Sequence, residues 1–459
     1  MSKLRILYVC HNHPDLHPGG TEIFTRDLFR AVKAQGDADA MLLACTNGLH
    51  RQRKPGTMFQ AIGRSSDELL AWTGHFDSFF QSQTDLYGTV PELSDLLRSF
   101  QPDIVHFHHS LLVGVEALFL VKRVRPQARV LFTLHDFYPI CVNDGQMVTT
   151  DGQRCRAASP DACRRCFPKI PQDRFALREH YLKTLFSQVD RFIAPSAFLK
   201  ERYVAWGLAP ERIEILRNGH GGASGAPHRP LAPGEARDRF GFFGHINRFK
   251  GAMVAVEAAG LLARRTDLPF TLRLHGGADF QTEAFRSGFE AAVAAVAQVR
   301  HCGRYDRADL PDLMRDIDWV VVPSVWWENA PLVIQEAFAH RRPVICSDIG
   351  GMAEAVCDEV DGLHFRAGDA EALMRQMRRA IAEPELWERL VGNIAPPRSI
   401  TESARDHLAL YRRLCDRPAA APSVRSAVRS AAHPAAGPIA GRASRPRRGR
   451  MAASSHVAS

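Results

Sequence analysis

The chain has 459 residues, of which 45% are hydrophobic and 24% are charged, as in an ordinary globular protein. Because a single hydrophobic core stops growing well below this length, two or three domains are expected. No stretch approaches the roughly 18 consecutive apolar residues of a membrane-spanning helix, and the N-terminus lacks the apolar segment of a signal peptide. These features predict a cytoplasmic protein, with a position at the inner face of the membrane left open.

The net charge of +9 lies mainly in the last part of the chain. Residues 416–459 hold eight Arg and one Asp, a charge of +7, which leaves the remainder close to neutral at +2. A nucleic-acid-binding domain would carry its basic footprint on a folded surface, so we expect no nucleic-acid partner. The segment is rich in Ala, Pro, Ser, Gly and Arg, which predicts a disordered basic tail.

Short apolar runs and amphipathic stretches alternate from the N-terminus to about residue 217. The predicted strands are 4–10, 38–45, 103–107, 130–133 and 214–216, and the predicted helices between them include 21–33, 92–100 and 112–123. This alternation is typical of a doubly wound, mainly parallel sheet.

Residues 218–234 interrupt the alternation with a high density of Gly and Pro, which marks a linker or a long loop. The pattern then resumes with predicted strands 239–243, 271–274, 299–301, 319–322 and 343–346, and helices 252–264, 283–297 and 401–414. The predicted fold class is α/β, with two Rossmann-like doubly wound domains facing each other across a cleft. The predicted limits are 1–217 for the N-terminal domain, 218–234 for the linker, 235–396 for the C-terminal domain, 397–415 for a helix that packs back on the first domain, and 416–459 for the tail.

The segment Trp327–Glu336 follows an apolar run, 319–323, which is typical of a buried strand in a parallel sheet. Pro331 suits the first turn of a helix, where its missing N–H costs nothing. Glu328 is therefore predicted in the loop and Glu336 about a turn and a half into the helix. Two carboxylates beside a helix N-terminus, which favours anions, indicate a ligand in which a sugar is attached to a phosphate.

Three further loops are predicted at the carboxyl ends of strands, where open α/β sheets bind ligands. Gly19 and Gly20 follow the first strand and allow a ligand to approach the backbone. Arg248 and Lys250 follow the first strand of the second half and could place positive charge against a diphosphate. The third loop is the Gly-Gly segment at 348–354. Because the first loop lacks the Gly-x-Gly-x-x-Gly fingerprint, a nicotinamide cofactor is not predicted.

Four motifs occur in order: Pro-Gly-Gly-Thr-Glu at 18–22, Gly-His-Ile-Asn-Arg-Phe-Lys-Gly at 244–251, Glu-x7-Glu at 328–336, and Asp-Ile-Gly-Gly-x-x-Glu at 348–354. Together they resemble the motifs of family 4 retaining glycosyltransferases of the GT-B fold. The resemblance spans residues 4–414, and the Glu-x7-Glu block is its most specific part. It implies a nucleotide sugar held mainly by the C-terminal domain and an acceptor met mainly by the N-terminal domain.

The resemblance also implies roles for individual residues. Glu336 would hold the ribose hydroxyls of the donor, Glu328 would lie near the transferred sugar, and Lys250 would contact the diphosphate. His135 resembles a family histidine near the reaction centre, so His135 and Glu328 are the predicted catalytic residues. Further donor contacts are implied at Asn329, Pro331 and Leu332, and Gly19 and Gly20 would line the opposite wall of the cleft.

One position departs from the family pattern. Many relatives have Arg directly after the glycine of the phosphate loop, where this chain has His245. A neutral imidazole offers one hydrogen-bond donor where a guanidinium offers five. Two alternatives stay open: Arg248 compensates for the missing guanidinium, or the diphosphate is held less strongly.

His106, His108 and His109 lie at the end of a predicted strand. Alternation sends His106 and His108 to the same face, which is geometrically compatible with a metal site. Polar residues that line the cleft at the end of a buried strand are the simpler explanation. His108 or His109 would then reach the acceptor.

Cys141, Cys155, Cys163 and Cys166 share one polar loop with the spacing C-x13-C-x7-C-x2-C. Four thiolates could hold a structural zinc ion that ties down a loop without a core of its own; reduced, unliganded thiols are the alternative. Disulfides are not expected in a cytosolic protein. No metal cofactor is predicted for catalysis, because the Asp-x-Asp at 316–318 directly precedes a buried strand and is better explained as a helix-to-strand turn.

These features predict transfer of a sugar from a nucleoside-diphosphate sugar, with UDP or GDP, to a hydroxyl of a glycan or lipid-linked glycan. Retention of the anomeric configuration is what the resemblance implies. Two carboxylates on one loop-helix unit do not face each other across a bond as in a glycosidase. The alternatives are an epimerase or phosphorylase on the same fold, or a non-catalytic polyanion-binding protein. Polysaccharide synthesis for the cell envelope, with peripheral membrane contact, is a family-level expectation.

Overall fold

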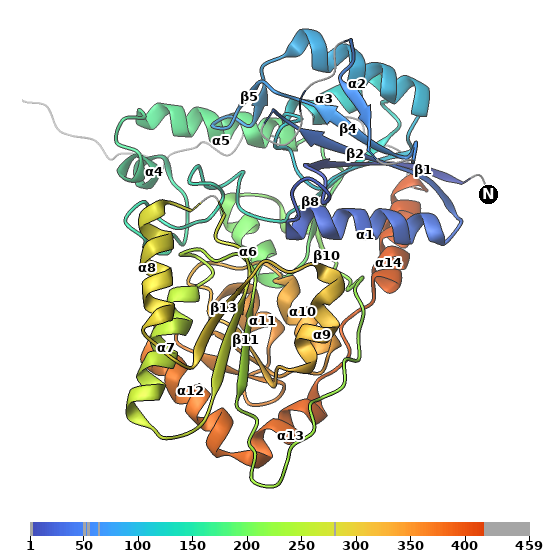
Figure 1. Cartoon of the computed structure of the whole chain (residues 1–459). Helices are drawn as coiled ribbons and strands as arrows, with labels where there is room; N and C mark the ends of the chain where they lie inside the picture. The colour runs from blue at the N-terminus through green and yellow to red at the C-terminus, as the bar shows by residue number, and fades with distance from the viewer. Residues whose placement is uncertain (1–2, 49–51, 53–55, 63–64, 280, 417–459) are drawn as a thin grey trace, which may run out of the picture. The chain divides into compact units, whose positions relative to one another are not determined.

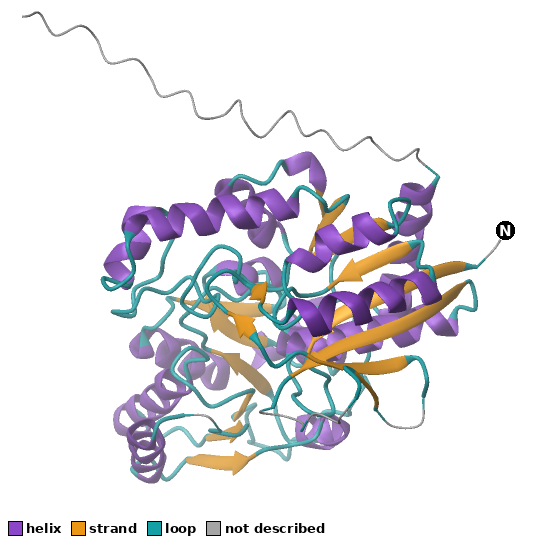
Figure 2. Ribbon diagram, turned by 90° about the horizontal axis from the view of Figure 1, so that it is seen from above, coloured by secondary structure: helices purple, strands orange, loops and turns teal. Residues whose placement is uncertain are grey.

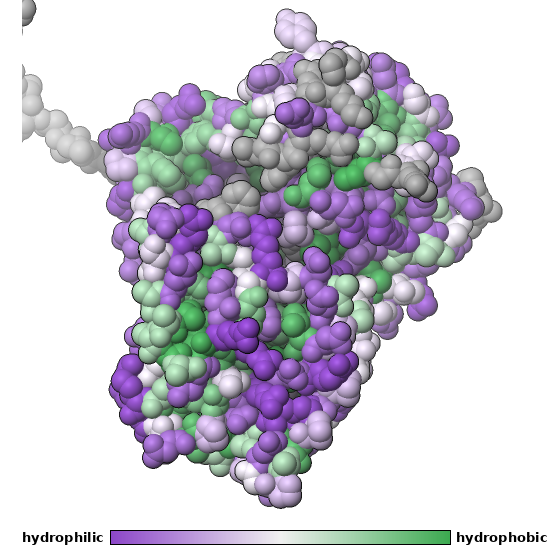
Figure 3. Space-filling view, viewed as in Figure 1, coloured by the Kyte–Doolittle hydropathy of each residue, from purple (hydrophilic) through white to green (hydrophobic). Residues whose placement is uncertain are grey.

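The computed structural model describes residues 3–48, 52, 56–62, 65–279 and 281–416. These residues belong to one compact unit that contains two large β-sheets with helices packed on them (Figure 1). The predicted basic tail lies outside the described residues apart from Asp416. Within the described ranges, no helix is both long and apolar enough to cross a membrane. Figure 3 shows hydrophilic and hydrophobic residues interspersed on one face of the molecule.

The first sheet has eight strands in the order β10-β9-β8-β7-β1-β2-β4-β3. Neighbouring strands are parallel, except that β3 runs antiparallel to β4. A separate hairpin is formed by β5 (Phe76–Asp77) and β6 (Ser82–Gln83). The strands of the sheet are β1 (Leu4–His11), β2 (Ala38–Thr46), β3 (Phe59–Ala61), β4 (Glu68–Trp72), β7 (Ile104–Phe107), β8 (Arg129–Thr133), β9 (Arg191–Ala194) and β10 (Ile213–Ile215).

Both faces of the first sheet are buried, which explains why its central strands are continuous apolar runs. Alternate residues of β1 enter two different cores: Leu7 and Val9 on one face, Ile6 and Tyr8 on the other. Figure 2 shows helices (purple) on both sides of the strands (orange). The helices of this half are α1 (Gly20–Ala34), α2 (Leu86–Phe100), α3 (Glu116–Val124), α4 (Pro160–Cys166), α5 (Gln172–Phe186) and α6 (Ala197–Trp206), with the 3-10 turn η1 (Pro210–Arg212).

Helix α3 begins later than the predicted stretch 112–123. Leu112 and Gly114 have φ angles of +70° and +88°, a left-handed backbone that cannot continue a right-handed helix. Helix α2 begins earlier than predicted because the Asp85 side chain caps it, accepting the N–H of Gly88 at 2.9 Å.

The second sheet has six strands in the order β13-β12-β11-β14-β15-β16, and all neighbours are parallel. Alternate residues of its central strand β14 again enter two cores, Trp319 and Val321 on one face and Val320 and Val322 on the other. The strands are β11 (Arg239–Phe243), β12 (Thr271–His275), β13 (Val299–Gly303), β14 (Trp319–Val322), β15 (Val344–Ser347) and β16 (Gly362–Phe365).

The helices that follow are mostly packed on the second sheet, and the last one returns to the first. In order they are α7 (Ala252–Arg265), α8 (Glu283–Ala294), the 3-10 turn η2 (Arg307–Asp309), α9 (Leu310–Arg315), α10 (Leu332–Ala339), α11 (Gly350–Ala355), α12 (Ala370–Ala382), α13 (Pro384–Asn393) and α14 (Ile400–Cys415). Helix α14 lies beside α1 (Figure 1), and its Leu408 and Tyr411 share a core with Phe24 of α1. The Tyr411 hydroxyl also contacts His106 of β7 at 2.7 Å.

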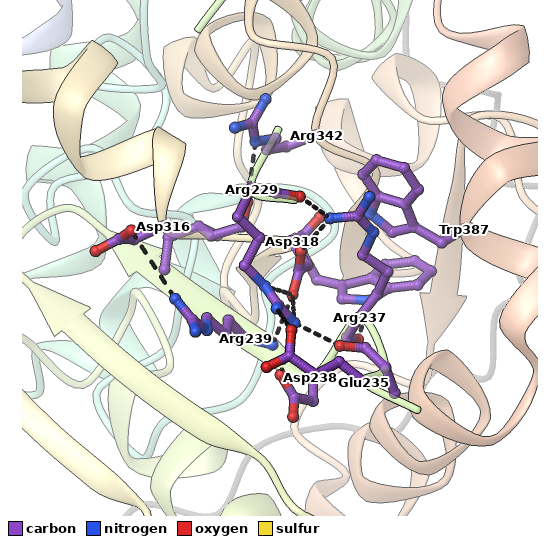
Figure 4. Close-up of polar contacts among 12 residues, drawn as sticks. Arg229, Glu235, Arg237, Asp238, Arg239, Asp316, Asp318, Arg342 and Trp387 are labelled. Carbon is purple, nitrogen blue, oxygen red and sulfur yellow. Dashed lines mark hydrogen bonds and ion pairs between the residues drawn. The ribbon is translucent and has the colours of Figure 1, made fainter. Parts of the chain in front are cut away.

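A buried ionic cluster supports the start of β11 and β14 (Figure 4). The Asp318 carboxylate accepts hydrogen bonds from Arg229 Nε at 3.0 Å and Arg237 Nη1 at 3.2 Å. The backbone N–H of Arg239 also donates to it at 3.1 Å, and the Asp318 carbonyl accepts from Trp387 Nε1 at 2.9 Å. Asp318 therefore pairs with the half-buried Arg237 and, together with Glu235 and Asp238, neutralises the buried Arg229, which is a structural task.

Replacing Asp318 by Asn is expected to lower the free energy of unfolding by about 3 kcal/mol, because it removes a fully buried carboxylate that lies between two guanidinium groups. Asp316→Asn is the matched control: its side chain is 51% exposed, against 1% for Asp318, so a loss below about 1 kcal/mol is expected. Urea titrations of both variants measure the difference. Equal losses would contradict the assigned role of Asp318.

Candidate active site

The segment with the two predicted carboxylates connects β14 to α10. Pro331 is the N-cap residue, with φ −65°, and the first helical residue is Leu332. Helix α10 therefore begins one residue later than Pro331 suggested. Glu328 lies in the loop, and Glu336 lies in the second turn of the helix, as the motif predicts.

The Glu328 carboxylate is buried and receives three hydrogen bonds on one oxygen, Oε1. Lys250 Nζ donates at 2.6 Å, Ser324 Oγ at 2.7 Å and Trp326 Nε1 at 2.9 Å. Burial raises the pKa of Glu328, but the Lys250 charge and the three donors outweigh it and bring the pKa below its ordinary value. The family resemblance implies that Lys250 contacts the diphosphate and that Glu328 lies near the sugar; in this structure the two side chains pair with each other.

Glu336 is also buried, but none of the described residues donates to its carboxylate as Lys250, Ser324 and Trp326 donate to Glu328. Its Oε1 lies 3.7 Å from Arg307 Nε, and burial raises its pKa while Arg307 opposes the rise. Arg307 also pairs with Asp27 of α1 at 2.6 Å. Sequence reasoning missed Arg307, because it lies in the turn η2 and no motif surrounds it.

The segment 244–251, called the phosphate loop below after the motif it carries, follows β11 and is held close to β14. The Asn247 side chain accepts the backbone N–H groups of Phe249 and Lys250 at 3.0 and 2.8 Å, which turns the chain into α7. Gly251 has φ +73°, and a Cβ there would lie 1.8 Å from the carbonyl oxygen of Pro323. Only glycine fits this position.

His245 and Arg248 lie on the exposed side of the same loop. Although the His245 side chain has an exposed surface, desolvation by the atoms around its ring lowers its pKa, and repulsion from Lys250 lowers it further, so this imidazole is neutral. The Arg248 guanidinium lies 4.8 Å from the ring centre of Phe249. Compensation by Arg248 and a weaker hold on the diphosphate both stay predictions.

The glycine loop after β1 approaches the start of α10. A Cβ on Gly20 would lie 3.7 Å from Leu332 Cδ1, and a Cβ on Gly19 would lie 2.4 Å from a carboxylate oxygen of Glu22. Gly20 and Leu332, predicted on opposite walls of a cleft, are therefore neighbours in the fold. Gly19 leaves the space that the Glu22 side chain occupies.

The Gly-Gly loop after β15 supports the backbone of Glu328. The N–H of Gly351 donates to the Glu328 carbonyl at 2.7 Å, and a Cβ on Gly351 would lie 2.0 Å from the carbonyl oxygen of Asn329. Glu354 of α11 accepts the first two backbone N–H groups of α6 at 2.9 and 2.8 Å. This loop thus links the Glu-x7-Glu segment to helix α6, which packs against β9 and β10 of the first sheet.

His135 follows β8, and its carbonyl oxygen accepts Asn329 Nδ2 at 2.8 Å. Burial lowers the pKa of His135 to about 3, so its ring is neutral. His108 is fully buried and contacts His135 Nε2 through Nδ1 at 2.9 Å. His109 is buried as well and pairs with Asp136 at 2.8 Å. The burial of His108 argues against a direct contact between its ring and an acceptor. Its ring contacts His135 instead.

The four cysteines lie in the loop around α4 and are partly exposed. Burial raises the pKa of Cys163 to about 11, and the other three thiols add to the rise. The four side chains are therefore close enough to influence one another's ionisation. In the described ranges, no three His, Cys, Asp or Glu side chains are arranged to hold a metal ion. The loop also touches the motif, since Trp327 Nε1 donates to the Cys155 carbonyl at 3.0 Å.

Sequence profiles assign the chain to a class. The profile described as Glycosyltransferase Family 4 matches residues 18–220, and that of Glycosyl transferases group 1 matches residues 237–383. Together with the two-sheet architecture, these matches show that the chain belongs to the family 4 glycosyltransferases of the GT-B fold. The fold-class prediction is thereby confirmed, and the chain is a glycosyltransferase.

Individual relatives are distant. The glycogen synthase of Mycobacterium tuberculosis is 24% identical over 404 residues, which cover 84% of this chain and 88% of that protein. Sucrose-phosphate synthase from Thermosynechococcus elongatus superposes with a TM-score of 0.63 at 21% identity, over 89% of this chain and 99% of that one. An Anabaena protein, HepE, solved with UDP and glucose, gives 0.60 at 16% identity, over 89% and 100%.

Replacing Gly251 by Ala is expected to destabilise the protein by at least about 1–2 kcal/mol, the cost of a left-handed residue with a Cβ, and the clash with Pro323 adds to it. Gly288→Ala is the control, because a Cβ added to this exposed glycine of α8 would meet no atom within 4 Å; a gain of up to about 1 kcal/mol is expected there. Thermal unfolding compares the two. A neutral Gly251→Ala would contradict the close approach of the phosphate loop to β14.

Zinc binding by the four thiols stays a prediction, and the metal content of the purified protein tests it directly. If the four thiols bind zinc, elemental analysis of the purified protein should find about one zinc per chain, and Cys163→Ser should lose it. Cys302→Ser is the control, because Cys302 is an exposed thiol in β13. A zinc-free protein would favour the free-thiol alternative.

Proposed function

We propose that this glycosyltransferase moves a sugar from a nucleoside-diphosphate sugar to a hydroxyl of a glycan or lipid-linked glycan, with retention of the anomeric configuration. The observation that carries the proposal is the convergence of Lys250, Glu328 and Glu336 around the start of α10. Lys250 is a cation, the pKa of Glu328 is lowered and the pKa of Glu336 is raised. These three groups match the three parts of such a donor: Lys250 the diphosphate, Glu328 the sugar and Glu336 the ribose.

The pairing of Lys250 with Glu328 prepares the site for a diphosphate. When the ammonium group turns to the phosphate oxygens, Glu328 keeps its bonds from Ser324 and Trp326. The carboxylate then stays satisfied and can accept hydrogen bonds from sugar hydroxyls. This arrangement lets a buried charge change partners without being left unpaired.

Bond cleavage between the sugar and the phosphate places negative charge on the leaving diphosphate. Lys250 would stabilise that charge. The backbone N–H groups in the first turn of α10 would add to this, because they have no acceptor within the helix. Electrostatic stabilisation of this kind is commonly the largest contribution to catalysis. Gly20, which approaches Leu332, would help to exclude water from the donor.

The nucleotide and retention parts of the proposal draw on the comparisons and the family resemblance. The Anabaena structure contains UDP and glucose, which supports a nucleotide sugar for this chain. Retention follows from the resemblance, and NMR of the product would test it: an α-linked donor should yield an α-linked product. A β-linked product would refute retention while leaving transfer itself intact.

An epimerase or a phosphorylase on the same fold would behave differently from a transferase. An epimerase turns over without an acceptor, and a phosphorylase uses inorganic phosphate in its place. Family membership and the relatives' names favour transfer. A lipid-linked acceptor would bring the enzyme to the inner face of the membrane, which flotation with acceptor-bearing vesicles would detect.

Replacing Lys250 by Ala is expected to lower kcat by about 100-fold or more, as for loss of one oxyanion-stabilising group. Glu336→Gln should chiefly raise the KM for the donor, by about 10-fold or more, since hydrogen bonds to a charged group contribute about 1.5–3 kcal/mol. The control Glu371→Gln alters an exposed carboxylate of α12 and should change neither constant.

Binding of nucleotides provides the independent check. A nucleoside diphosphate that binds the native state should raise the melting temperature of the wild type, and Lys250→Ala should reduce that rise. A panel of UDP, GDP and ADP would also identify the base. Unchanged kinetics in both site variants, or no response to any nucleotide, would refute the assigned donor site.

A further inference from the structure

Arg307 joins the two halves of the molecule beside the predicted ribose site. It lies in η2 of the second half, and its Nη1 donates to Asp27 Oδ2 of α1 at 2.6 Å. Its Nε lies 3.7 Å from Glu336 Oε1. The Asp27 and Glu336 side chains are 18% and 12% exposed, against 31% for Arg307. One guanidinium group therefore faces a carboxyl group of each half, at a place where little solvent screens the charges.

The two contacts of Arg307 are unequal. The bond to Asp27 has the short length of a charge-assisted hydrogen bond, whereas 3.7 Å to Glu336 is too long for a hydrogen bond. Among the described residues, Arg307 Nε has no hydrogen-bond partner. A planar guanidinium can serve two carboxylates at once, which the point charge of a lysine does less well. The contact with Asp27 is thus complete in this structure, and a small movement would complete the contact with Glu336.

The protonation of Glu336 accounts for the longer of the two distances. Burial raises the pKa of Glu336, the charge of Arg307 opposes this rise, and the charge of Asp27 adds to it. A carboxyl group that holds its proton more firmly attracts a guanidinium less. A ligand that favours the ionised form of Glu336 would therefore draw Arg307 closer.

Helix α1 connects Asp27 to the donor loop. The helix begins at Gly20, where an added Cβ would lie 3.7 Å from Leu332 Cδ1, and Asp27 follows about two turns later. Helix α1 thus meets the second half at an apolar contact with Leu332 and at an ionic contact with Arg307. Because apolar contacts are not directional, the ion pair is the contact that fixes the orientation of the helix relative to the donor loop.

The first segment that connects the two halves packs against the same ion pair. A Cβ on Gly221 would lie 2.6 Å from Asp27 Oδ2. The preceding His220 pairs with the second connecting segment, since its N–H donates to the Arg398 carbonyl at 2.7 Å. Movement of two bodies against each other is absorbed in the few residues that connect them. A change in the contacts of Arg307 therefore bears directly on how the halves lie.

We propose that Arg307 is a positioning residue that couples nucleotide binding at Glu336 to the position of α1. The inference rests on the ribose-binding role proposed for Glu336 above. Ribose hydroxyls donate hydrogen bonds to Glu336 and favour its ionised form, which attracts the guanidinium more strongly. Arg307 then lies between two carboxylates and holds Asp27, and with it α1 and Gly20, against the donor site. The bound nucleotide thereby sets the position of the acceptor half before transfer.

Amide hydrogen exchange with and without nucleotide tests this coupling. The probe is whichever of UDP, GDP and ADP raises the melting temperature of the wild type most. At saturation it should slow exchange in peptides covering residues 20–34 at least about fivefold, the lower end of typical coupling between sites. Asp27→Asn and Arg307→Gln should each abolish this slowing. The double variant should match Arg307→Gln, because both changes remove the same contact.

Two further variants sharpen the test. Glu336→Gln should also lose the slowing at saturating nucleotide, because a neutral amide does not attract Arg307. Arg412→Gln is the control, since Arg412 of α14 pairs with Asp37 at 2.8 Å and so breaks an ion pair between two elements of the first half. It should keep the slowing of the wild type. Should one site variant fail to fold, the remaining ones decide.

The outcomes separate this inference from the function on which it rests. Wild-type slowing in Asp27→Asn or in Arg307→Gln would overturn the coupling, while nucleotide binding and transfer stand. A wild type that binds nucleotide without any slowing in α1 would do the same. Loss of the slowing in Arg412→Gln as well would show a general loosening of the structure and would overturn the assignment to Arg307. A wild type that responds to no nucleotide would refute the donor site itself.

Discussion

The buried carboxylate of Glu328 is the interaction on which the organisation of the site depends. A buried charge is stable only where hydrogen bonds and an opposite charge replace water. Lys250 from the phosphate loop and Ser324 and Trp326 from the loop after β14 meet this need on one oxygen, and Gly351 binds the backbone carbonyl of the same residue. Loops that follow three different strands of the second sheet are thereby held at a single residue.

Residues around Glu328 connect this site to loops and a helix that surround the first sheet. Asn329 donates to the carbonyl of His135, and Trp327 donates to the carbonyl of Cys155. Arg307 pairs with Asp27 of α1 while it faces Glu336. Each contact joins a donor-side residue to a backbone or carboxylate group of the other half. A ligand that moves any of these donor-side residues would therefore also change contacts with the acceptor side.

Sequence patterns act over short stretches of chain, so they predicted the parts of this site that are local and missed the contacts between distant segments. The two parallel sheets and the position of Glu336 follow from apolar runs and helical spacing, which are local patterns. The partner of Glu336 does not, because Arg307 lies in a short turn after β13 and only the fold brings it close. His108 illustrates an intermediate case: alternation placed it on the same face as His106 at the end of a strand, but its contact with His135 depends on how the segments after β7 and β8 pack together. The strands β3, β5 and β6, with 3, 2 and 2 residues, are too short to show a periodicity.

Three buried glutamates show how neighbours decide protonation in one site. Glu328 has three donors and a lowered pKa, whereas Glu336 has one distant guanidinium and a raised pKa. Burial, together with the nearby charge of Asp136, raises the pKa of Glu22 to about 8, and its Oε1 lies 3.2 Å from His11 Nε2. Because ribose hydroxyls donate hydrogen bonds, a bound nucleotide would supply Glu336 with the donors it lacks and favour its ionised form. If Glu336 binds the ribose as we propose, donor binding and loss of the Glu336 proton are thermodynamically linked. Donor affinity would then rise with pH until Glu336 is ionised in the free enzyme.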